Sequence, residues 1–497
     1  MMLDFCYQAP RIENAPRDLD QFMGLNAPLK LLICHQNLKA TLLARPELAP
    51  AALQSALGQE GPCLCPIIGS PDEQGLLLLV FSDALGEGHG RYRRIRQWIA
   101  PLASYQSREL ALYLEGFDGD ETARLGEALL ASLLAANVSL PSQKREAKAV
   151  CAYDRILSSP AFPLDVTRLC AEAEGNALAR HLGVLPASVL DAPGYRQRVR
   201  ALARQEGWQC QEYDEAALQA LGAGAFLAVS RGSEDGQGAI VKLSYEPAGA
   251  ERTLALVGKG ICHDSGGYNL KVGGSMYGMH LDMGGSAVAL GTLLAISRAR
   301  LPVRVHCWLA IAENHIGPRA YRPGEVVTAC NGTTIEVVDT DAEGRMVLAD
   351  ALALAARDQP SLIVDYATLT GACKRALGSG YSGAFTNQPA WLLPLIALGQ
   401  ESGERVWPFP HDEDYDDNLT SEWADLLQCA PGASPDHIDA TRFLGRFVPA
   451  TIPWLHLDLS GYRNKGGNGV VGSEVTGFGV RFTLHLLARW QAGELDA

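Results

Sequence analysis

The chain has 497 residues, of which 47% are hydrophobic and 20% charged, and its formal net charge is −14. This length predicts two or three domains, because a single hydrophobic core rarely grows beyond roughly 250–300 residues. The acidic balance argues against sequence-independent nucleic-acid binding, which needs a basic surface. Apolar runs such as Leu76–Phe81 are too short to span a membrane, and the N-terminal segment lacks a secretion signal, so we expect a cytoplasmic protein with reduced cysteines.

Residues 1–150 predict a small N-terminal α/β domain. Apolar, strand-like segments alternate with alanine-rich, helix-like ones, at 29–35 and 75–82 for the strands and at 91–103 and 122–136 for the helices. This part of the sequence shows no nucleophile, metal cluster or phosphate loop, so we expect a packing or oligomer-forming role. Helix breakers and charges at 139–149 suit a domain boundary, and residues 151–185 predict a helical connector.

Residues 186–497 predict a larger α/β domain. The expected strands are 253–258, 302–314, 334–338, 361–368 and 454–461, and the expected helices are 194–207, 282–299, 344–357, 392–402 and 476–490. Such alternation predicts a mostly parallel central sheet flanked by helices. In sheets of this kind, ligands bind at the carboxyl ends of the strands.

Two glycine-rich segments, Val257–Asp282 and Asp339–Asp350, concentrate charged side chains. These are Lys259, Asp264, Lys271, Asp282, Asp341, Glu343 and Arg345. Lys259 and Asp264 are expected just after a strand end. Asp341 and Glu343 are expected between a strand and a helix start, so both segments belong at one edge of the sheet. Clustered carboxylates raise one another's pKa unless cations offset their charge. Four of them exceed the needs of one catalytic ion, so we expect two divalent ions.

The cations of this set leave alternatives open. Lys259 is either an ammonium paired with a carboxylate or a neutral amine that ligates a metal, and the free lysine pKa of about 10.4 favours the ion pair. Lys271 can polarise a carbonyl, and Arg345 can bind a small anion. His263 adjoins Asp264, but neighbours on an extended chain point to opposite faces. The alternative to a metal centre is a structural cluster of ion pairs.

Several sequence blocks together resemble the leucyl aminopeptidase (cytosol aminopeptidase) family, peptidase family M17. The blocks are VGKGICHDSGG, DMGG, AYRPGEVV, DTDAEGRMVLADAL, DYATLTGA, WLHLDLSG and TGFGVR, and they run from about residue 177 to the C-terminus. The K…D…K…D spacing of 5, 7 and 11 residues and the TDAEGR block are the most specific. The resemblance implies a metal-dependent aminopeptidase that releases N-terminal residues, leucine-like ones preferred, from peptides, with residues 186–497 as its catalytic domain.

The resemblance also implies roles for individual residues. The ligands of a dinuclear site, holding Mn²⁺ or Zn²⁺ with Mg²⁺ or Co²⁺ as alternatives, would be Lys259, Asp264, Asp282, Asp341 and Glu343. Lys271 would polarise the carbonyl attacked by a metal-bridging water, and Arg345 would hold a bicarbonate that acts as base. The substrate would contact Met279, Thr368, Leu369 and Gly371. The family further implies a homohexamer.

Some positions depart from the pattern of this family. Asp339 stands where asparagine is usual, His263 where an aromatic residue is usual and His280 where a lysine is common, and the loop at 315–319 differs as well. None of these removes an expected ligand or catalytic residue. Two other functions stay open at this point: a non-catalytic or DNA-binding member of the same fold, and another two-metal hydrolase such as a phosphoesterase.

Overall fold

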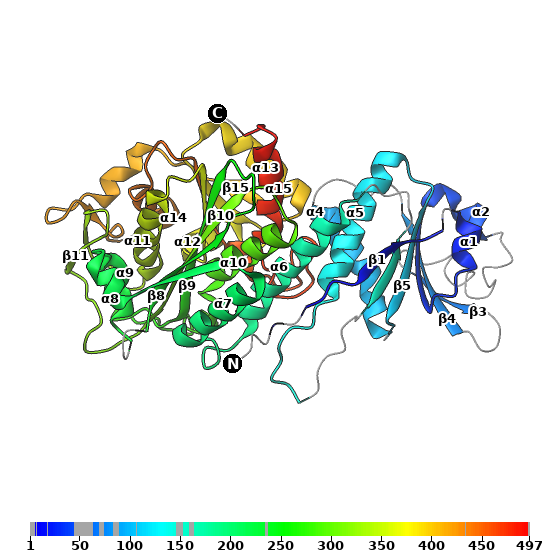
Figure 1. Ribbon diagram of the computed structural model, residues 1–497, viewed down its shortest axis with the longest axis horizontal. Helices are drawn as coiled ribbons and strands as arrows, with labels where there is room; N and C mark the ends of the chain where they lie inside the picture. The colour runs from blue at the N-terminus through cyan, green and yellow to red at the C-terminus, as the bar shows by residue number, and fades with distance from the viewer. Residues whose placement is uncertain are drawn as a thin grey trace. The chain divides into compact units, whose positions relative to one another are not determined.

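The computed structural model describes residues 5, 7–16, 18–43, 63–68, 74–82, 89–105, 107–145, 153–158, 164–233, 237–432 and 434–495. Two compact units make up the chain (Figure 1). The N-terminal unit holds Tyr7–Ala173 and Gly469–Gly472, and the C-terminal unit includes Glu174–Asn468 and Ser473–Ala497. Of the boundary segment expected at 139–149, residues 146–149 lie outside the described residues.

The N-terminal unit contains a six-stranded sheet in the order β1-β6-β5-β2-β4-β3. Its strands are β1 (Arg11–Asn14), β2 (Leu29–His35), β3 (Cys63–Ile68), β4 (Gln74–Ser82), β5 (Glu109–Glu115) and β6 (Arg155–Ser158). Its helices are α1 (Leu19–Met23), α2 (Lys39–Leu43), α4 (His89–Ile99) and α5 (Gly119–Ala136). β3 is antiparallel to β4, and the other pairs are parallel. β6 lies inside the stretch expected to be a helical connector, and it joins the sheet because Ile156 and Leu157 are buried there.

The C-terminal unit is built on an eight-stranded sheet in the order β15-β14-β17-β13-β9-β10-β8-β7. Its strands are β7 (Gln209–Asp214), β8 (Ala239–Tyr245), β9 (Thr253–Asp264), β10 (Arg304–Asn314), β13 (Leu362–Ala367), β14 (Ser382–Thr386), β15 (Val406–Pro408) and β17 (Trp454–Asp458). The four central strands, β17, β13, β9 and β10, are parallel. β14 is antiparallel to β17, while β8 is antiparallel to β10 and β7 to β8.

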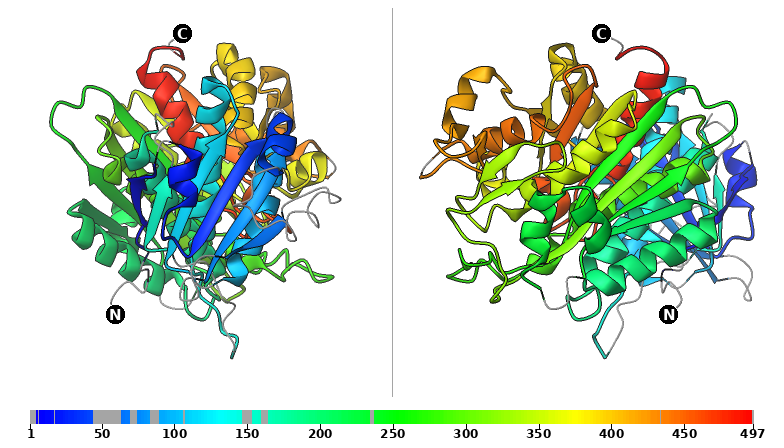
Figure 2. Two further views of the ribbon diagram at one scale, coloured as in Figure 1. Left: turned by 90° about the vertical axis from the view of Figure 1, so that its right-hand side faces the viewer. Right: turned by 60° about the vertical axis from the view of Figure 1, so that its left-hand side comes forward.

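Helices cover both faces of this sheet, as Figure 2 shows. They are α6 (Val166–Val184), α7 (Ala192–Glu206), α8 (Glu215–Ala220), α9 (Gly224–Ser230), α10 (Gly284–Arg298), α11 (Glu343–Arg357), α12 (Gly371–Leu377), α13 (Leu392–Ser402), α14 (Asp436–Gly445) and α15 (Val480–Gln491). Alternate residues of β9 enter opposite cores. Leu254 and Leu256 pack with α10 and α15, whereas Ala255 and Val257 pack with α9 and α11. Burial on both faces explains why the central strands are continuous apolar runs.

Three sequence predictions about these elements were wrong in detail. β9 was expected to end at residue 258, but it continues to Asp264 because β10 pairs with it as far as Asn314. The strand expected at 334–338 is β12 (Thr334–Glu336), which belongs to a separate small sheet with β11 (Val326–Thr328) and β16 (Leu426–Leu427). The last helix begins at Val480 rather than at 476.

One helical stretch, Met279–Arg298, is long and apolar enough to cross a membrane by length and composition. It contains α10, and 89% of its most apolar window is buried inside the unit. Core helices of soluble proteins pass the same test, and packing of α10 against one face of the central strands and against α15 accounts for its apolar character.

Candidate active site

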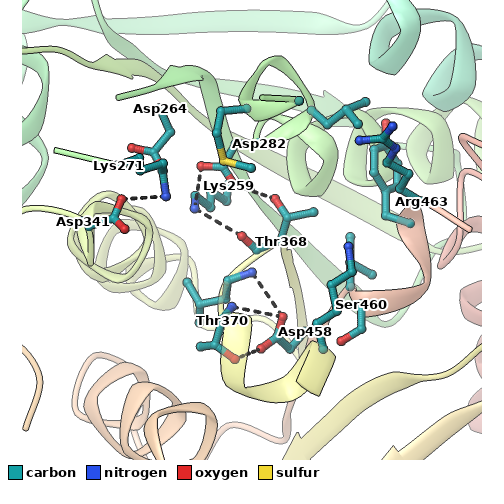
Figure 3. A pocket seen from close by; sticks show the side chains of 18 of the residues that line it. Lys259, Asp264, Lys271, Asp282, Asp341, Thr368, Thr370, Asp458, Ser460 and Arg463 are labelled. Carbon is teal, nitrogen blue, oxygen red and sulfur yellow. Dashed lines mark hydrogen bonds and ion pairs between the residues drawn. The ribbon is translucent and has the colours of Figure 1, made fainter. Parts of the chain in front are cut away.

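The carboxyl ends of the central strands bring the charged residues of the two glycine-rich segments to one pocket. β9 ends at Asp264, β10 at Asn314 and β17 at Asp458, and Thr368 follows the end of β13. The pocket has a volume of about 300 Å³ and includes six of the seven charged residues singled out above: Lys259, Asp264, Lys271, Asp282, Asp341 and Glu343 (Figure 3). Although β12 lies in another sheet, the segment that follows it reaches this edge as expected.

Three carboxylates of the pocket form a compact cluster. Oxygen atoms of Asp264, Asp341 and Glu343 all lie within 4.8 Å of one another. The buried Asn314 holds this arrangement, because its Nδ2 donates to Asp264 Oδ1 and to the Thr340 carbonyl, both at 2.9 Å. Oxygen donors at this spacing suit hard divalent cations. The residues present therefore fit a metal centre.

Lys259 projects from the middle of β9 into the most buried part of the pocket. Its Nζ lies 2.7 Å from Asp282 Oδ2 and 2.8 Å from Glu343 Oε1, and it donates to the Thr368 carbonyl at 3.2 Å. Gly344 makes room for it, since a Cβ at that position would lie 2.6 Å from Lys259 Nζ. The start of α11 thus forms one wall of the space that the Lys259 side chain occupies.

Lys271 bridges the other two carboxylates. Its Nζ lies 2.8 Å from Asp264 Oδ2 and 2.6 Å from Asp341 Oδ1. Each lysine therefore joins one carboxylate of the first glycine-rich segment to one of the second. Lys271 is more exposed than Lys259, which places its ammonium where the pocket opens.

Burial and mutual repulsion raise the pKa of carboxylates in this pocket. Burial raises the pKa of Asp282 to about 6, although Lys259 acts in the opposite direction. Burial, followed by repulsion from Asp264, raises the pKa of Glu343 well above its usual value. For Lys259, burial alone would lower the pKa, but Asp282, Glu343 and Asp264 outweigh it and raise it. Two lysines do not fully compensate four carboxylates in this environment, and divalent cations would do so.

Arg345 is the one charged residue of the set that does not line the pocket. Its side chain is only 3% exposed, and its Nη2 lies 2.5 Å from Asp436 Oδ1 at the start of α14. Nη1 donates to the Gln428 carbonyl at 3.3 Å. A carboxylate of the chain itself thus occupies one side of this guanidinium.

The residues expected to contact substrate all line the pocket: Met279, Thr368, Leu369 and Gly371. Asp458 fixes the backbone between them. It accepts hydrogen bonds from the amides of Leu369 and Thr370 at 3.1 and 3.4 Å and from Thr370 Oγ1 at 2.7 Å. Thr368 Oγ1 donates to Asp282 Oδ1 at 2.8 Å, which ties this segment to the carboxylates as well.

The positions that depart from the family pattern lie beside the cluster. The rings of His263 and His315 meet edge to face, with centroids 5.8 Å apart, and His263 is not among the three clustered metal-ligating groups found in the described residues. Burial, Arg463 and His263 lower the pKa of His280. Asp339 Oδ1 accepts a hydrogen bond from the Asp341 amide, which an asparagine oxygen would accept equally well.

Sequence reasoning overlooked several residues of the site. Asn314 ends a strand next to β9, and that position at the carboxyl edge was a signal for it. Asp458 ends β17 at the same edge, whereas His456 of that strand pairs with Asp365 at 2.6 Å and does not line the pocket. Lys374, Ser460 and Arg463 also line the pocket, and their short-range sequence context gives no indication of it.

The model of the cytosol aminopeptidase family, catalytic domain, matches residues 177–484. The chain belongs to the cytosol aminopeptidase family. A probable cytosol aminopeptidase from Synechococcus sp. (strain CC9605) is 36% identical over 423 residues, which are 84% of this chain and 86% of the relative. One from Stutzerimonas stutzeri (strain A1501) is 43% identical over 307 residues, or 60% of this chain and 61% of the relative.

Two solved structures resemble this cytosol aminopeptidase over nearly its whole length. The bottromycin maturation enzyme BotP in complex with Mn has a TM-score of 0.79 and 32% identity, and the match covers 93% of this chain and 99% of that one. The cytosol aminopeptidase of Coxiella burnetii has a TM-score of 0.78 and 28% identity, with 93% and 97% covered. The α/β fold, the family and a metal-dependent aminopeptidase activity on peptides, all expected from the sequence, are thereby confirmed.

Proposed function

We propose that this aminopeptidase holds two divalent ions, Mn²⁺ or Zn²⁺ with Mg²⁺ or Co²⁺ as alternatives, and removes the first residue of peptides. The ligands would be Lys259, Asp264, Asp282, Asp341 and Glu343. The observation that supports this most directly is the convergence of Asp264, Asp341 and Glu343 within 4.8 Å. When bound, the ions supply Lewis acidity and activate a water for hydrolysis.

The side chains around the ions have separate catalytic roles. Lys271, near the pocket opening, directs its ammonium at the carbonyl oxygen of the scissile bond and stabilises the negative charge that develops there. A bicarbonate beside Arg345 would accept a proton from the water. Asp436 already contacts that guanidinium, so an anion there would share Arg345 with a carboxylate of the chain.

The pocket favours the end of a peptide over its middle. Its volume of about 300 Å³ lies at the lower end for ligand pockets and suits one or two residues. The carboxylates and bound ions at one end would receive the substrate's α-amine, while Met279, Thr368, Leu369 and Gly371 would contact the residue attached to it. The family resemblance implies a leucine-like first residue, so leucine anilide is the reference substrate.

Assembly and location follow the same resemblance. Tyr277 and Val272 near the pocket are 84% and 74% exposed, and contiguous exposed apolar patches mark interaction surfaces. We propose a cytoplasmic homohexamer, with residues 1–150 in a packing role, and its molar mass in solution tests the assembly.

Metal removal tests the proposed function. We expect chelated enzyme to lose hydrolysis of leucine p-nitroanilide and to regain it with Mn²⁺ or Zn²⁺, with about two ions bound per chain at full recovery. A phosphatase substrate panel and a DNA mobility-shift assay at physiological salt address the two alternatives. If metal-loaded protein hydrolysed a phosphoester but no aminoacyl anilide, the aminopeptidase proposal would be wrong.

A further inference from the structure

The substrate pocket has two oppositely charged ends. In Figure 3 the carboxylates of Asp264 and Asp341 lie on one side, and Ser460 and Arg463 lie on the other. Lys374 of α12 also lines the pocket. Lys259 and Lys271 are engaged by the carboxylate cluster, so Arg463 and Lys374 are the pocket cations outside it.

Both of these cations keep unused capacity for hydrogen bonds. Among the described residues, Arg463 has one hydrogen-bond partner, Glu474, through Nε at 2.7 Å. The two side chains are 39% and 51% exposed, and such exposed pairs contribute little energy. Lys374 is exposed, and within the described ranges its side-chain ammonium has no ion-pair or hydrogen-bond partner. A guanidinium offers five donors, so the terminal nitrogens of Arg463 are available.

The backbone opens space for the Arg463 guanidinium beside the expected side-chain contact Met279. Gly278 precedes Met279 with φ of +92°, and a Cβ on it would lie 2.9 Å from Arg463 Nη1. The guanidinium therefore rests against a bare stretch of backbone. The planar guanidinium of Arg463 in this position matches the geometry of a carboxylate.

Asp458, the remaining carboxylate of the pocket, does not cancel this basic end. Its oxygens accept the Leu369 and Thr370 amides and the Thr370 hydroxyl, so its charge is directed into the backbone at the start of α12. Because the end with the carboxylates and the bound ions would receive an amine, the two available cations at the other end make the pocket complementary to a small molecule that also carries an acid.

We propose that Arg463, assisted by Lys374, selects peptides whose first residue has a side-chain carboxylate, glutamate or aspartate. This inference rests on the proposed aminopeptidase function and deepens it. The α-amine faces the end of the pocket with the carboxylates and bound ions, and the side chain of the same residue extends past Met279 toward Arg463. The preference of this protein thereby departs from the leucine-like residue that the family resemblance implies.

The test compares the p-nitroanilides of glutamate, glutamine and leucine. Glutamine has nearly the shape of glutamate without its charge, so the ratio of kcat/KM for glutamate over glutamine isolates the contribution of charge. We expect this ratio to exceed roughly 10 in the unaltered enzyme and to fall about 10-fold or more in Arg463→Met, because charge-assisted hydrogen bonds are lost. Arg463→Lys should retain part of it, and Lys374→Met should lower it less.

Two further variants sharpen this comparison. Glu474→Gln removes the competing carboxylate and should raise the glutamate ratio. Arg446→Met is the matched control: Arg446 is 49% exposed and pairs with Asp416 at 2.6 Å, but it does not line the pocket, so its ratio should equal that of the unaltered enzyme. Thermal unfolding of every variant checks that the fold is retained.

A separate experiment tests a second carboxylate that Arg463 could bind. The C-terminal carboxylate of a dipeptide could also meet Arg463, and anilides lack that group. If Arg463→Met changed the preference for Leu-Gly over Leu-Gly-amide but left the glutamate ratio intact, the first-residue assignment would be overturned.

Binding separates failure of this inference from failure of the proposed function. Calorimetry should show tighter binding of L-glutamate than of L-glutamine to the metal-loaded enzyme, and Arg463→Met should abolish the difference. Turnover of leucine anilide with a glutamate ratio of 1 or less would reject the inference and leave the aminopeptidase proposal standing. No turnover of any anilide would reject the proposed function, while the calorimetric difference would still decide the role of Arg463.

Discussion

The contacts of single site residues in the structure define their roles more closely than their sequence context does. Residue chemistry assigned Lys259 an ion pair, and the family resemblance assigned it to a metal. The structure shows the contacts on which both depend: its Nζ lies between Asp282 and Glu343. In this position Lys259 neutralises both carboxylates, and its nitrogen lies where the proposed metal ligand would have to be. Asp436 shows the limit of sequence, because it contacts Arg345 across 91 residues that no local pattern connects.

Lys271 gives the sharpest prediction at this scale. We expect Lys271→Ala to lower kcat by about 100-fold or more, because it removes the cation that faces the developing oxyanion. The metal content, measured by elemental analysis, should not fall, since removing an ammonium from beside Asp264 and Asp341 increases their attraction for divalent ions. Lys271→Arg should keep part of the activity. A kcat that falls only in proportion to lost metal would contradict the catalytic role.

At the scale of elements, the central strands were predictable and the peripheral ones were not. β9, β10 and β13 are buried on both faces, so their apolar runs identify them without tertiary information. β14 reads Ser-Gly-Ala-Phe-Thr, with one large apolar side chain, and its place is set by pairing with β17. The continuation of β9 through Lys259 depended on β10 in the same way. Long-range pairing, absent from local sequence, decided these cases.

The contact of α11 with β9 leads to an element-scale prediction. In Gly344→Ala the new Cβ would lie 2.6 Å from Lys259 Nζ, so the lysine has to move from Asp282 and Glu343. We expect metal affinity, measured by chelator competition, to fall about 10- to 100-fold. The helix itself should remain, because alanine is the better helix former by up to about 1 kcal/mol.

Gly119→Ala is the control for that substitution. Gly119 also begins a helix, α5, and a Cβ there meets no atom within 4 Å. Metal affinity should therefore stay unchanged in this variant. Equal effects of the two substitutions would show that the close approach of Gly344 to Lys259 does not matter.

For the whole molecule, the two-domain α/β class and the family were accessible from sequence because the charged residues of the site lie in short, specific blocks. The charged ends of the pocket could not be predicted from the sequence. Arg463 follows β17 and Lys374 lies in α12, and only the sheet order places both around one cavity. Properties of the assembled unit, such as the pH dependence of its stability, arise at this scale too.

His411 links the packing of the C-terminal unit to pH. Its ring meets Trp454 edge to face at 5.4 Å, Nε2 donates to the Thr441 carbonyl at 3.2 Å, and Nδ1 accepts from Arg442 at 3.3 Å. The contact with Arg442 requires the neutral ring, because Nδ1 can accept a hydrogen bond only when it is unprotonated. Burial lowers the pKa of His411 from 6.5 to about 4. Between pH 6.5 and pH 4, therefore, His411 is protonated in the unfolded chain but neutral in the folded chain. Its stabilising contribution is fully present above pH 6.5 and is lost as the pH falls toward 4.

This gives a prediction with a defined sign. The contribution of His411 to the free energy of unfolding should decrease by at most about 3 kcal/mol from pH 6.5 to pH 4. Other groups titrate in the same window, among them Asp350, whose pKa burial raises to about 6. The informative quantity is thus the difference between the unaltered protein and His411→Gln, both metal-loaded and unfolded with denaturant across this range. Because glutamine keeps a donor and an acceptor but cannot be protonated, the variant should lose less stability on acidification, and parallel pH profiles would show that His411 is not held neutral by its contacts.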